Sequence, residues 1–97
     1  MVIGAPKGFE NIPIYAGGMI FGRDDGHVRL DDPSISSRHF QVDTVGNDLF
    51  VRDLDSSNGT LLNGHPIRYS EILPGDELRV GQTILVLRVE GDGISRD

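Results

Sequence analysis

The chain has 97 residues, which is enough for one small domain with one hydrophobic core. Its 15 acidic and 9 basic residues leave a net charge of -6, which argues against nucleic acid or anionic membrane as a partner, because both need a basic surface. No apolar run approaches the roughly 20 residues of a membrane-spanning helix, and no signal-peptide pattern is present. Without cysteine the chain has no disulfide and no thiolate metal site, and we expect a cytoplasmic protein. Because no apolar run is long enough, we expect no membrane insertion.

Glycine and proline are frequent, with 13 and 5 residues, and they interrupt almost every window that could form an amphipathic helix. Short runs typical of strands lie between these turn residues. Asn63-Gly64 is a typical two-residue hairpin turn, and it connects the run 61–62 to the run 65–67. In chain order we expect strands at 2–4, 12–15, 19–21, 28–30, 39–45, 49–54, 61–62, 65–67, 77–80 and 83–89.

The segment 39–45 alternates in polarity, with Phe40 and Val42 on one face and His39, Gln41 and Asp43 on the other. Many short strands at regular spacing are typical of a β-sandwich. The sequence therefore predicts an all-β fold of about 10–11 short strands in two packed antiparallel sheets, with binding loops at one end. We expect one domain over 1–90 and a polar C-terminal tail over 91–97.

Three polar segments stand apart from the strand pattern: Gly22-Arg23, residues 36–39 (Ser-Ser-Arg-His) and residues 56–60 (Ser-Ser-Asn-Gly-Thr). Loops at one end of a sandwich can converge. Gly-Arg, then Ser-x-x-His about fourteen residues later, then Asp-x-x-Ser-Ser-Asn-Gly-Thr and Asn-Gly resembles a forkhead-associated (FHA) domain. The late segment 75–81 fits the same family, and the resemblance covers about residues 2 to 89.

This resemblance implies a module that binds phosphothreonine in a partner protein, downstream of a Ser/Thr kinase. Carried over by position, it implies that Arg23 pairs with the phosphate and that Ser36 donates its hydroxyl to a phosphate oxygen. Ser37, Arg38 and Ser57 would add further phosphate contacts. A phosphothreonine carries about -1.5 to -2 charge and strong acceptors, which a guanidinium, hydroxyls and backbone N–H groups can satisfy together.

The resemblance also implies supporting roles around the phosphate. Asn58 would hold the backbone of the bound peptide. Gly22 would leave room for a close backbone approach, His39 would bond across to fix the Ser36 and Asn58 loops, and Gly59 would support the site. No cofactor is expected.

The same residues also permit other functions. Ser36, His39 and Asp53 supply the residue types of a catalytic triad, but the sequence has no nucleophile elbow, phosphate-binding glycine loop or zinc-protease motif, which argues against an enzyme. The histidines lack metal-ligand spacing. The acidic residues of the loops, Asp24, Asp25, Asp31 and Asp32, could coordinate a cation, but they are predicted to be solvated charges. The alternative function is a phospho-independent scaffold or oligomerisation domain of a larger protein.

Overall fold

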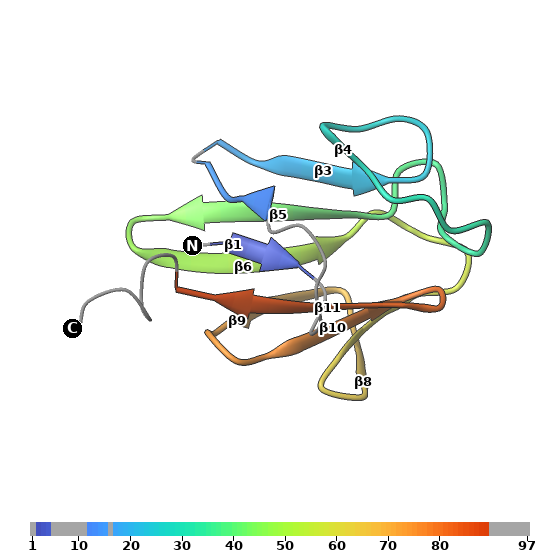
Figure 1. Ribbon diagram of the computed structural model, residues 1–97. Coiled ribbons are helices and arrows are strands. Elements are labelled where there is room, and N and C mark those ends of the chain that lie inside the picture. The colour runs from blue at the N-terminus through green and yellow to red at the C-terminus, as the bar shows by residue number, and fades with distance from the viewer. Residues whose placement is uncertain (1, 5–11, 16, 90–97) are drawn as a thin grey trace.

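The structure is a computed structural model that describes residues 2–4, 12–15 and 17–89. Within these residues the chain forms short strands and no helix (Figure 1). The strands are β1 (Val2–Gly4), β2 (Ile12–Pro13), β3 (Met19–Gly22), β4 (Val28–Arg29), β5 (Phe40–Val45), β6 (Asp48–Asp53), β7 (Thr60–Leu62), β8 (His65–Ile67), β9 (Tyr69–Ile72), β10 (Glu77–Val80) and β11 (Thr83–Arg88).

These strands form two sheets. One has the order β2-β1-β11-β10-β7-β8 and the other the order β4-β3-β5-β6-β9. The paired strands run antiparallel except for β3 and β4, which run parallel with Phe21 opposite Val28 and Gly22 opposite Arg29. The prediction of a two-sheet β-sandwich is therefore confirmed. The predicted tail, 91–97, lies outside the described residues.

The core lies between the sheets and is built from alternating inward side chains of both. Phe21 of β3 and Phe40 of β5 stack at its centre, with ring centroids 4.6 Å apart. The other buried members are aliphatic: Ile3, Leu30, Ile35, Val42, Leu49, Val51, Ile72, Leu78, Val80, Leu85 and Leu87. Leu30 and Ile35 belong to the β4–β5 connection, so apolar burial holds the start and the middle of that loop against the sandwich.

The strand β9 was not predicted, because its sequence does not alternate clearly between apolar and polar residues. It forms the edge of the five-stranded sheet, and its inward positions are Ser70 and Ile72, of which only Ile72 is apolar. The outward Tyr69 stacks on Phe50 of β6 at 5.3 Å, and the Arg52 guanidinium lies 4.5 Å from the Tyr69 ring. Cross-strand packing of this kind stabilises an edge strand that has little core contact.

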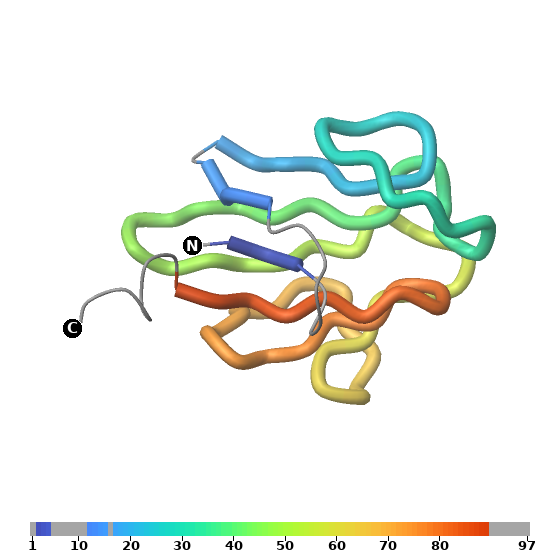
Figure 2. The backbone as a smooth tube through the Cα atoms, viewed as in Figure 1, coloured from blue at the N-terminus to red at the C-terminus, as the bar shows by residue number. Residues whose placement is uncertain are grey.

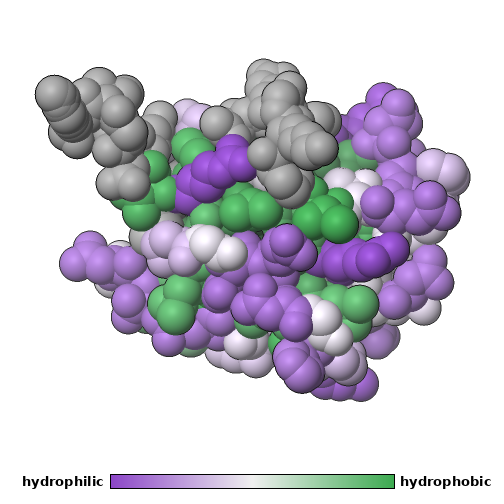
Figure 3. All heavy atoms as spheres, turned by 60° about the horizontal axis from the view of Figure 1, so that its bottom comes forward, coloured by the Kyte–Doolittle hydropathy of each residue, from purple (hydrophilic) through white to green (hydrophobic). Residues whose placement is uncertain are grey.

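The connections β3–β4, β4–β5, β6–β7 and β10–β11 gather at one end of the sandwich, at the right in Figures 1 and 2. Figure 3 shows this end covered mostly by hydrophilic side chains, whereas hydrophobic patches are visible nearer the middle of the same face. Among the described residues no helix is long and apolar enough to cross a lipid bilayer. The predicted binding loops therefore lie together at a polar end of the fold.

Candidate functional site

The polar segments singled out in the sequence are joined by hydrogen bonds at the loop end. The Arg23 backbone N–H donates to the Ser36 carbonyl at 2.9 Å, which joins the β3–β4 and β4–β5 loops. The Ser57 N–H donates to Ser36 Oγ at 2.9 Å, and Asn58 Nδ2 donates to the Ser34 carbonyl at 2.8 Å, which join the β6–β7 loop to the same segment. Residues more than 20 positions apart thus form one surface.

The β4–β5 loop begins with a turn that its sequence favours. In Asp32-Pro33-Ser34-Ile35, proline follows the turn's first residue and the Ile35 N–H donates to the Asp32 carbonyl at 3.0 Å. Asp32 Oδ1 accepts from the Ser34 N–H at 2.9 Å and from Ser34 Oγ at 2.6 Å, as in an Asx turn. The turn sends the Ile35 side chain into the core and leaves Ser36 at the surface end of the loop.

The expectation that Asp32 is a solvated charge is wrong. Its side chain is only 8% exposed, and its second oxygen accepts from the Gln82 N–H at 2.9 Å and from Thr83 Oγ1 at 2.7 Å. The carboxylate therefore ties the β4–β5 loop to the β10–β11 hairpin. Hydrogen bonds, first from Ser34 Oγ and then from Thr83 Oγ1, hold the pKa of Asp32 well below its usual value. The Asp-Pro-Ser turn pattern was the signal in the sequence that could have indicated this anchor.

Asp53, at the end of β6, organises the β6–β7 loop in a similar way. Its Oδ1 accepts from Ser56 Oγ and from Thr60 Oγ1, both at 2.6 Å, and Oδ2 accepts from the Ser56 N–H at 3.2 Å. Burial raises the pKa of Asp53, but the bonds from Ser56 and Thr60 outweigh it and hold the pKa below its usual value. The Gly59 N–H donates to Ser56 Oγ at 3.0 Å, so the network continues to the end of the loop.

His39 lies between the two loops and is fully buried. The alternation had placed it on the face of Gln41, but β5 begins only at Phe40 and the His39 ring turns inward. Its Nδ1 accepts from the Ser36 N–H at 3.1 Å, so Nε2 carries the proton and donates to the Gly59 carbonyl at 2.8 Å. A neutral imidazole thus bridges the Ser36 loop and the Gly59 end of the β6–β7 loop.

Gly22 marks a close approach of two backbones. The N–H groups of Asp24 and Asp25 donate to the Ser37 carbonyl at 3.3 and 3.0 Å, which brings that carbonyl over Gly22. A Cβ atom at Gly22 would lie 2.0 Å from the Ser37 oxygen, far inside van der Waals contact. Only glycine fits this backbone approach without a shift of the β4–β5 loop.

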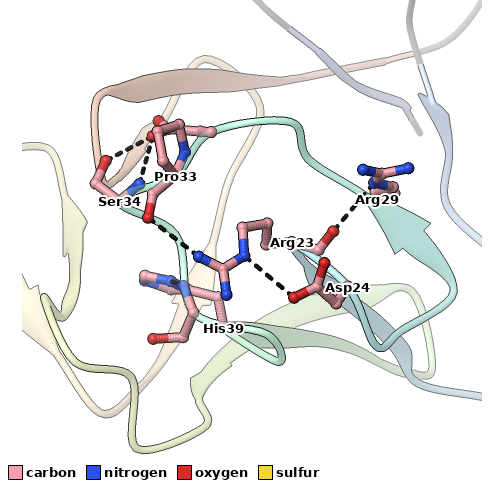
Figure 4. Close-up of polar contacts among 8 residues, drawn as sticks. Arg23, Asp24, Arg29, Pro33, Ser34 and His39 are labelled. Carbon is pink, nitrogen blue, oxygen red and sulfur yellow. Dashed lines mark hydrogen bonds and ion pairs between the residues drawn. The ribbon is translucent and has the colours of Figure 1, made fainter.

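The Arg23 guanidinium is held from two sides (Figure 4). Its Nη1 donates to the Pro33 carbonyl at 3.3 Å, and its Nε donates to Asp24 Oδ2 at 3.1 Å. The Arg23 carbonyl in turn accepts from Arg29 Nε at 3.2 Å. Among the described residues Arg23 Nη2 has no hydrogen-bond partner, so the arginine keeps donor capacity toward an added ligand.

An open pocket of about 250 Å³ lies beside this guanidinium. Its lining residues come from the three joined loops: Arg23, Pro33, Ser34, Ile35, Ser36, Ser37, Ser57 and Asn58. Ser36 Oγ accepts from the Ser57 N–H, so its own hydroxyl hydrogen stays available for donation. Gly59, with φ of +83°, turns the chain just after Asn58. The pocket therefore offers several donors and no carboxylate in its lining.

Arg38 lies elsewhere. Its side chain lines a second open pocket, together with Asp53, Leu54, Asp55 and Arg68. The structure therefore brings Arg23, Ser36, Ser37, Ser57 and Asn58 together at one pocket, with Gly22, His39 and Gly59 behind it, and separates Arg38 from that group.

Ser36, His39 and Asp53 do not form the hydrogen-bonded relay of a catalytic triad. His39 Nδ1 accepts from the backbone N–H of Ser36 rather than from its hydroxyl, and the Asp53 carboxylate is occupied by Ser56 and Thr60. Among the described residues no group of three or more His, Cys, Asp or Glu side chains could hold a metal ion.

The two anchoring carboxylates predict acid lability of the fold. Because the folded-state pKa of both Asp32 and Asp53 lies below the ordinary aspartate value of about 4, their stabilising contribution is complete above that pH and is lost as the pH falls below it. We expect the melting temperature to be nearly constant from pH 7 to 5 and to fall steeply below pH 4. Thermal unfolding followed by circular dichroism measures this.

Asp32→Asn should lower the melting temperature at pH 7 and flatten its dependence on pH below 4. Asp31→Asn, at an exposed neighbouring aspartate, serves as the matched control and should retain the parent profile. An unchanged acid limb in Asp32→Asn and Asp53→Asn would contradict this account of the loop anchors.

The arrangement agrees with comparisons to known proteins. The FHA domain family model matches residues 19–81, which include all three loops of the pocket. This chain belongs to the FHA domain family. The FHA domain is 34% identical over 74 residues to FhaA of Mycobacterium tuberculosis, covering 75% of this chain and 14% of FhaA. It is also 36% identical over 62 residues to the glycogen accumulation regulator GarA of Mycolicibacterium smegmatis, covering 64% of this chain and 39% of GarA.

Among solved structures, one from a structural and functional analysis of phosphothreonine-dependent FHA domain interactions superimposes on this FHA domain with a TM-score of 0.86. The two are 28% identical, and the match covers 92% of this chain and 95% of that chain. By contrast, the match to the curated relatives spans well under half of their length. The resemblance thus concerns the FHA domain and not the remainder of those proteins.

Proposed function

We propose that this FHA domain binds phosphothreonine in a partner protein that a Ser/Thr kinase has modified. One observation carries the proposal: the Arg23 guanidinium and the Ser36 hydroxyl face the same polar pocket, on loops that hydrogen bonds lock together. A similar solved domain comes from a study of phosphothreonine-dependent interactions.

In this proposal Arg23 supplies the charge and Ser36 a hydroxyl donor to the phosphate oxygens. Ser37 and Ser57, which also line the pocket, add polar contacts. Asn58 has one amide hydrogen committed to the Ser34 carbonyl, and its remaining amide groups hold the peptide backbone. Arg38 is left out of the phosphate site because its side chain lines the other pocket.

Gly22, His39 and Gly59 act behind the pocket in this proposal. Gly22 admits the Ser37 carbonyl, and the His39 ring spaces the Ser36 loop from the Gly59 backbone. A preorganised pocket loses less conformational entropy on binding, which favours affinity. None of these residues takes part in a chemical step, so the proposal is a binding module and not an enzyme.

The net charge of -6 does not prevent binding of a dianion. An arginine about 4 Å from a phosphate gains roughly 4 kcal/mol of Coulomb energy at an effective dielectric near 20. Charges beyond the Debye length, about 8 Å at physiological salt, are largely screened. The contact terms decide affinity, and the remote acidic surface mainly slows encounter.

Calorimetry with a degenerate phosphothreonine peptide library, its phosphoserine counterpart and its unphosphorylated counterpart tests the proposal. Loss of the phosphate removes at least two charge-assisted hydrogen bonds of about 1.5–3 kcal/mol each, so the unphosphorylated peptides should bind at least about 100-fold more weakly. The phosphoserine peptides lack one methyl, worth about 0.8 kcal/mol or fourfold. If phosphorylated and unphosphorylated peptides bind equally, a phospho-independent scaffold replaces this function.

The ion pair between Arg23 and Asp24 predicts a variant with higher affinity. The Asp24 carboxylate is exposed and bonds the same guanidinium that would meet the phosphate, so it repels the incoming anion. Asp24→Asn removes the charge and keeps an oxygen that can accept from Arg23 Nε. Because an exposed ion pair contributes about 0–1 kcal/mol, we expect a gain in affinity of up to about fivefold.

Calorimetry with one phosphothreonine peptide measures this gain, and Asp25→Asn on the same loop is the charge-matched control. Weaker binding of Asp24→Asn than of the parent would show that Asp24 acts by orienting Arg23 and not by competing for it.

We also propose that the domain works in the cytoplasm, because protein kinases act there on ATP and the chain has no cysteine that would indicate an oxidising compartment. The folded module would span residues 1–90, with 91–97 as a polar tail. Fractionation of cells that express a fluorescent fusion of the full-length protein, with the fluorescence measured in each fraction, tests this placement.

A further inference from the structure

The backbone of the turn 32–35 holds two side chains of the proposed phosphothreonine site. The Pro33 carbonyl accepts from Arg23 Nη1 at 3.3 Å, a contact visible in Figure 4. The next carbonyl, that of Ser34, accepts from Asn58 Nδ2 at 2.8 Å. Because a hydrogen bond is directional, the orientation of these two carbonyls fixes where the Arg23 guanidinium and the Asn58 amide lie.

The Asp32 carboxylate connects this turn to the β10–β11 hairpin. Its Oδ1 accepts from the N–H and the hydroxyl of Ser34, which closes the turn. Its Oδ2 accepts from the Gln82 N–H at 2.9 Å and from Thr83 Oγ1 at 2.7 Å, groups that lie 50 and 51 positions later in the chain. The orientation of the turn therefore depends on a hairpin that contributes no residue to the lining of the phosphate pocket.

The hairpin and the turn are in direct contact at Gly81. A Cβ atom at this position would lie 2.6 Å from Ser34 Oγ and 3.2 Å from Asp32 Oδ2, so no side chain fits between the two segments. Of the two hairpin donors to Asp32, one is a backbone N–H and the other is the Thr83 hydroxyl. A hydrogen bond to a carboxylate is stronger than one between neutral groups, so the hydroxyl is a substantial part of this connection.

We propose that Asp32 and Thr83 are positioning residues of the phosphothreonine site. Through the two carbonyls of the turn 32–35 they hold the Arg23 guanidinium and the Asn58 amide in the orientation that the ligand needs. Neither Asp32 nor Thr83 lines the pocket, so both act without touching the ligand. This inference rests on the proposed function and extends its site to the start of β11. Groups that contact a ligand bind it more tightly when a supporting layer of hydrogen bonds holds them in place beforehand.

A contact that only stabilises the fold differs measurably from one that positions the site. Loss of a merely stabilising contact lowers the melting temperature, but the protein that stays folded binds as before. Loss of a positioning contact weakens binding even where all of the protein is folded. Affinity measured far below the melting temperature therefore separates the two roles.

Thr83→Val tests the proposal, because it removes the hydroxyl and nearly conserves the shape of the side chain. Fluorescence anisotropy at 10 °C with one labelled phosphothreonine peptide measures the affinity, and circular dichroism verifies that each variant is folded. We expect Thr83→Val to bind about five- to tenfold more weakly than the parent. Thr83→Ser, which restores the hydroxyl, should bind within about twofold of the parent. Asp32→Asn, which loses the charge and one acceptor oxygen, should weaken binding at least as much as Thr83→Val.

Thr44→Val is the matched control, since it makes the same substitution in β5 next to the β5–β6 turn, at the end opposite the binding loops (Figure 1). Thr44 Oγ1 is buried and has no hydrogen-bond partner among the described residues, so its removal should raise the melting temperature and leave the affinity unchanged. Nuclear magnetic resonance gives a second readout. The Arg23 Nε–H and the Asn58 side-chain amide signals should shift in Thr83→Val and stay in place in Thr44→Val.

The outcomes separate this inference from the proposed function. If the parent binds the phosphothreonine peptide and both Thr83→Val and Asp32→Asn bind it equally well, the positioning role is refuted and phosphothreonine binding stands. If Thr83→Ser binds as weakly as Thr83→Val, or if Thr44→Val loses as much affinity, the hydroxyl bond to Asp32 is not the cause and the assignment is wrong. If the parent binds no phosphothreonine peptide, the proposed function itself fails, and the positioning role fails with it.

Discussion

Arg23→Gln is expected to weaken phosphothreonine peptide binding by about 100-fold while the melting temperature changes little. The substitution keeps a side chain that can donate a hydrogen bond but removes the charge beside the pocket. Charge-assisted hydrogen bonds contribute about 1.5–3 kcal/mol each, and a tenfold change in affinity corresponds to about 1.4 kcal/mol. The lost Arg23–Asp24 ion pair is exposed and contributes no more than about 1 kcal/mol to folding.

Titration calorimetry measures the affinity, and thermal unfolding of the same samples measures the stability. Arg79→Gln is the matched control, because it lowers the net charge equally at an exposed position of β10. Ser36→Ala gives a second test, since it removes a hydroxyl that both lines the pocket and accepts from the Ser57 N–H. Parent-like affinity in both Arg23→Gln and Ser36→Ala would refute the proposed phosphate site.

His39→Phe is expected to reduce both stability and binding. Phenylalanine fills a similar volume but leaves the Ser36 N–H and the Gly59 carbonyl without their partners in a fully buried position. Each unsatisfied buried group costs about 1–3 kcal/mol, so the free energy of unfolding should fall by about 3 kcal/mol. In a domain of this size that lowers the melting temperature by roughly 12–24 °C.

Binding should weaken in this variant because the imidazole no longer holds the Ser36 segment to the end of the β6–β7 loop. Measurement at 10 °C, where the variant remains folded, separates the loss of affinity from the loss of folded protein. His65→Phe on the exposed strand β8 is the control and should change stability by less than about 0.5 kcal/mol. A His39→Phe protein with parent stability would contradict the bridging role.

The sandwich followed from the sequence because its strands are short apolar runs separated by turn residues with specific backbone demands. Asn63 and Gly64 have φ of +49° and +86°, as a two-residue hairpin between β7 and β8 requires. Gly81, with φ of +60°, begins the turn between β10 and β11. Where such signals were weak, as in the polar edge strand β9, the sequence did not reveal the element.

The site residues were recognisable because their types and order match a family pattern, but the sequence did not show which pocket each side chain enters. Ser37 and Arg38 are neighbours, yet they line different pockets. At this point the chain passes from the loop into β5, and the next residue, His39, is buried. Charge alone was equally ambiguous for the aspartates. Asp31 is exposed and Asp32 is buried under four hydrogen bonds, although both lie in one polar run.

The sequence by itself therefore determined the fold class, the family and the residues that gather at the loop end, because periodicity, turn chemistry and motif spacing are local properties. The net charge of -6 was equally available, and it excluded partners that need a broad basic surface. The tertiary structure decided the burial of Asp32, the bridge through His39 and the pairing of Arg23 with Asp24. It also decided that Arg38 and Arg68 share a pocket, because burial and proximity depend on how distant segments pack.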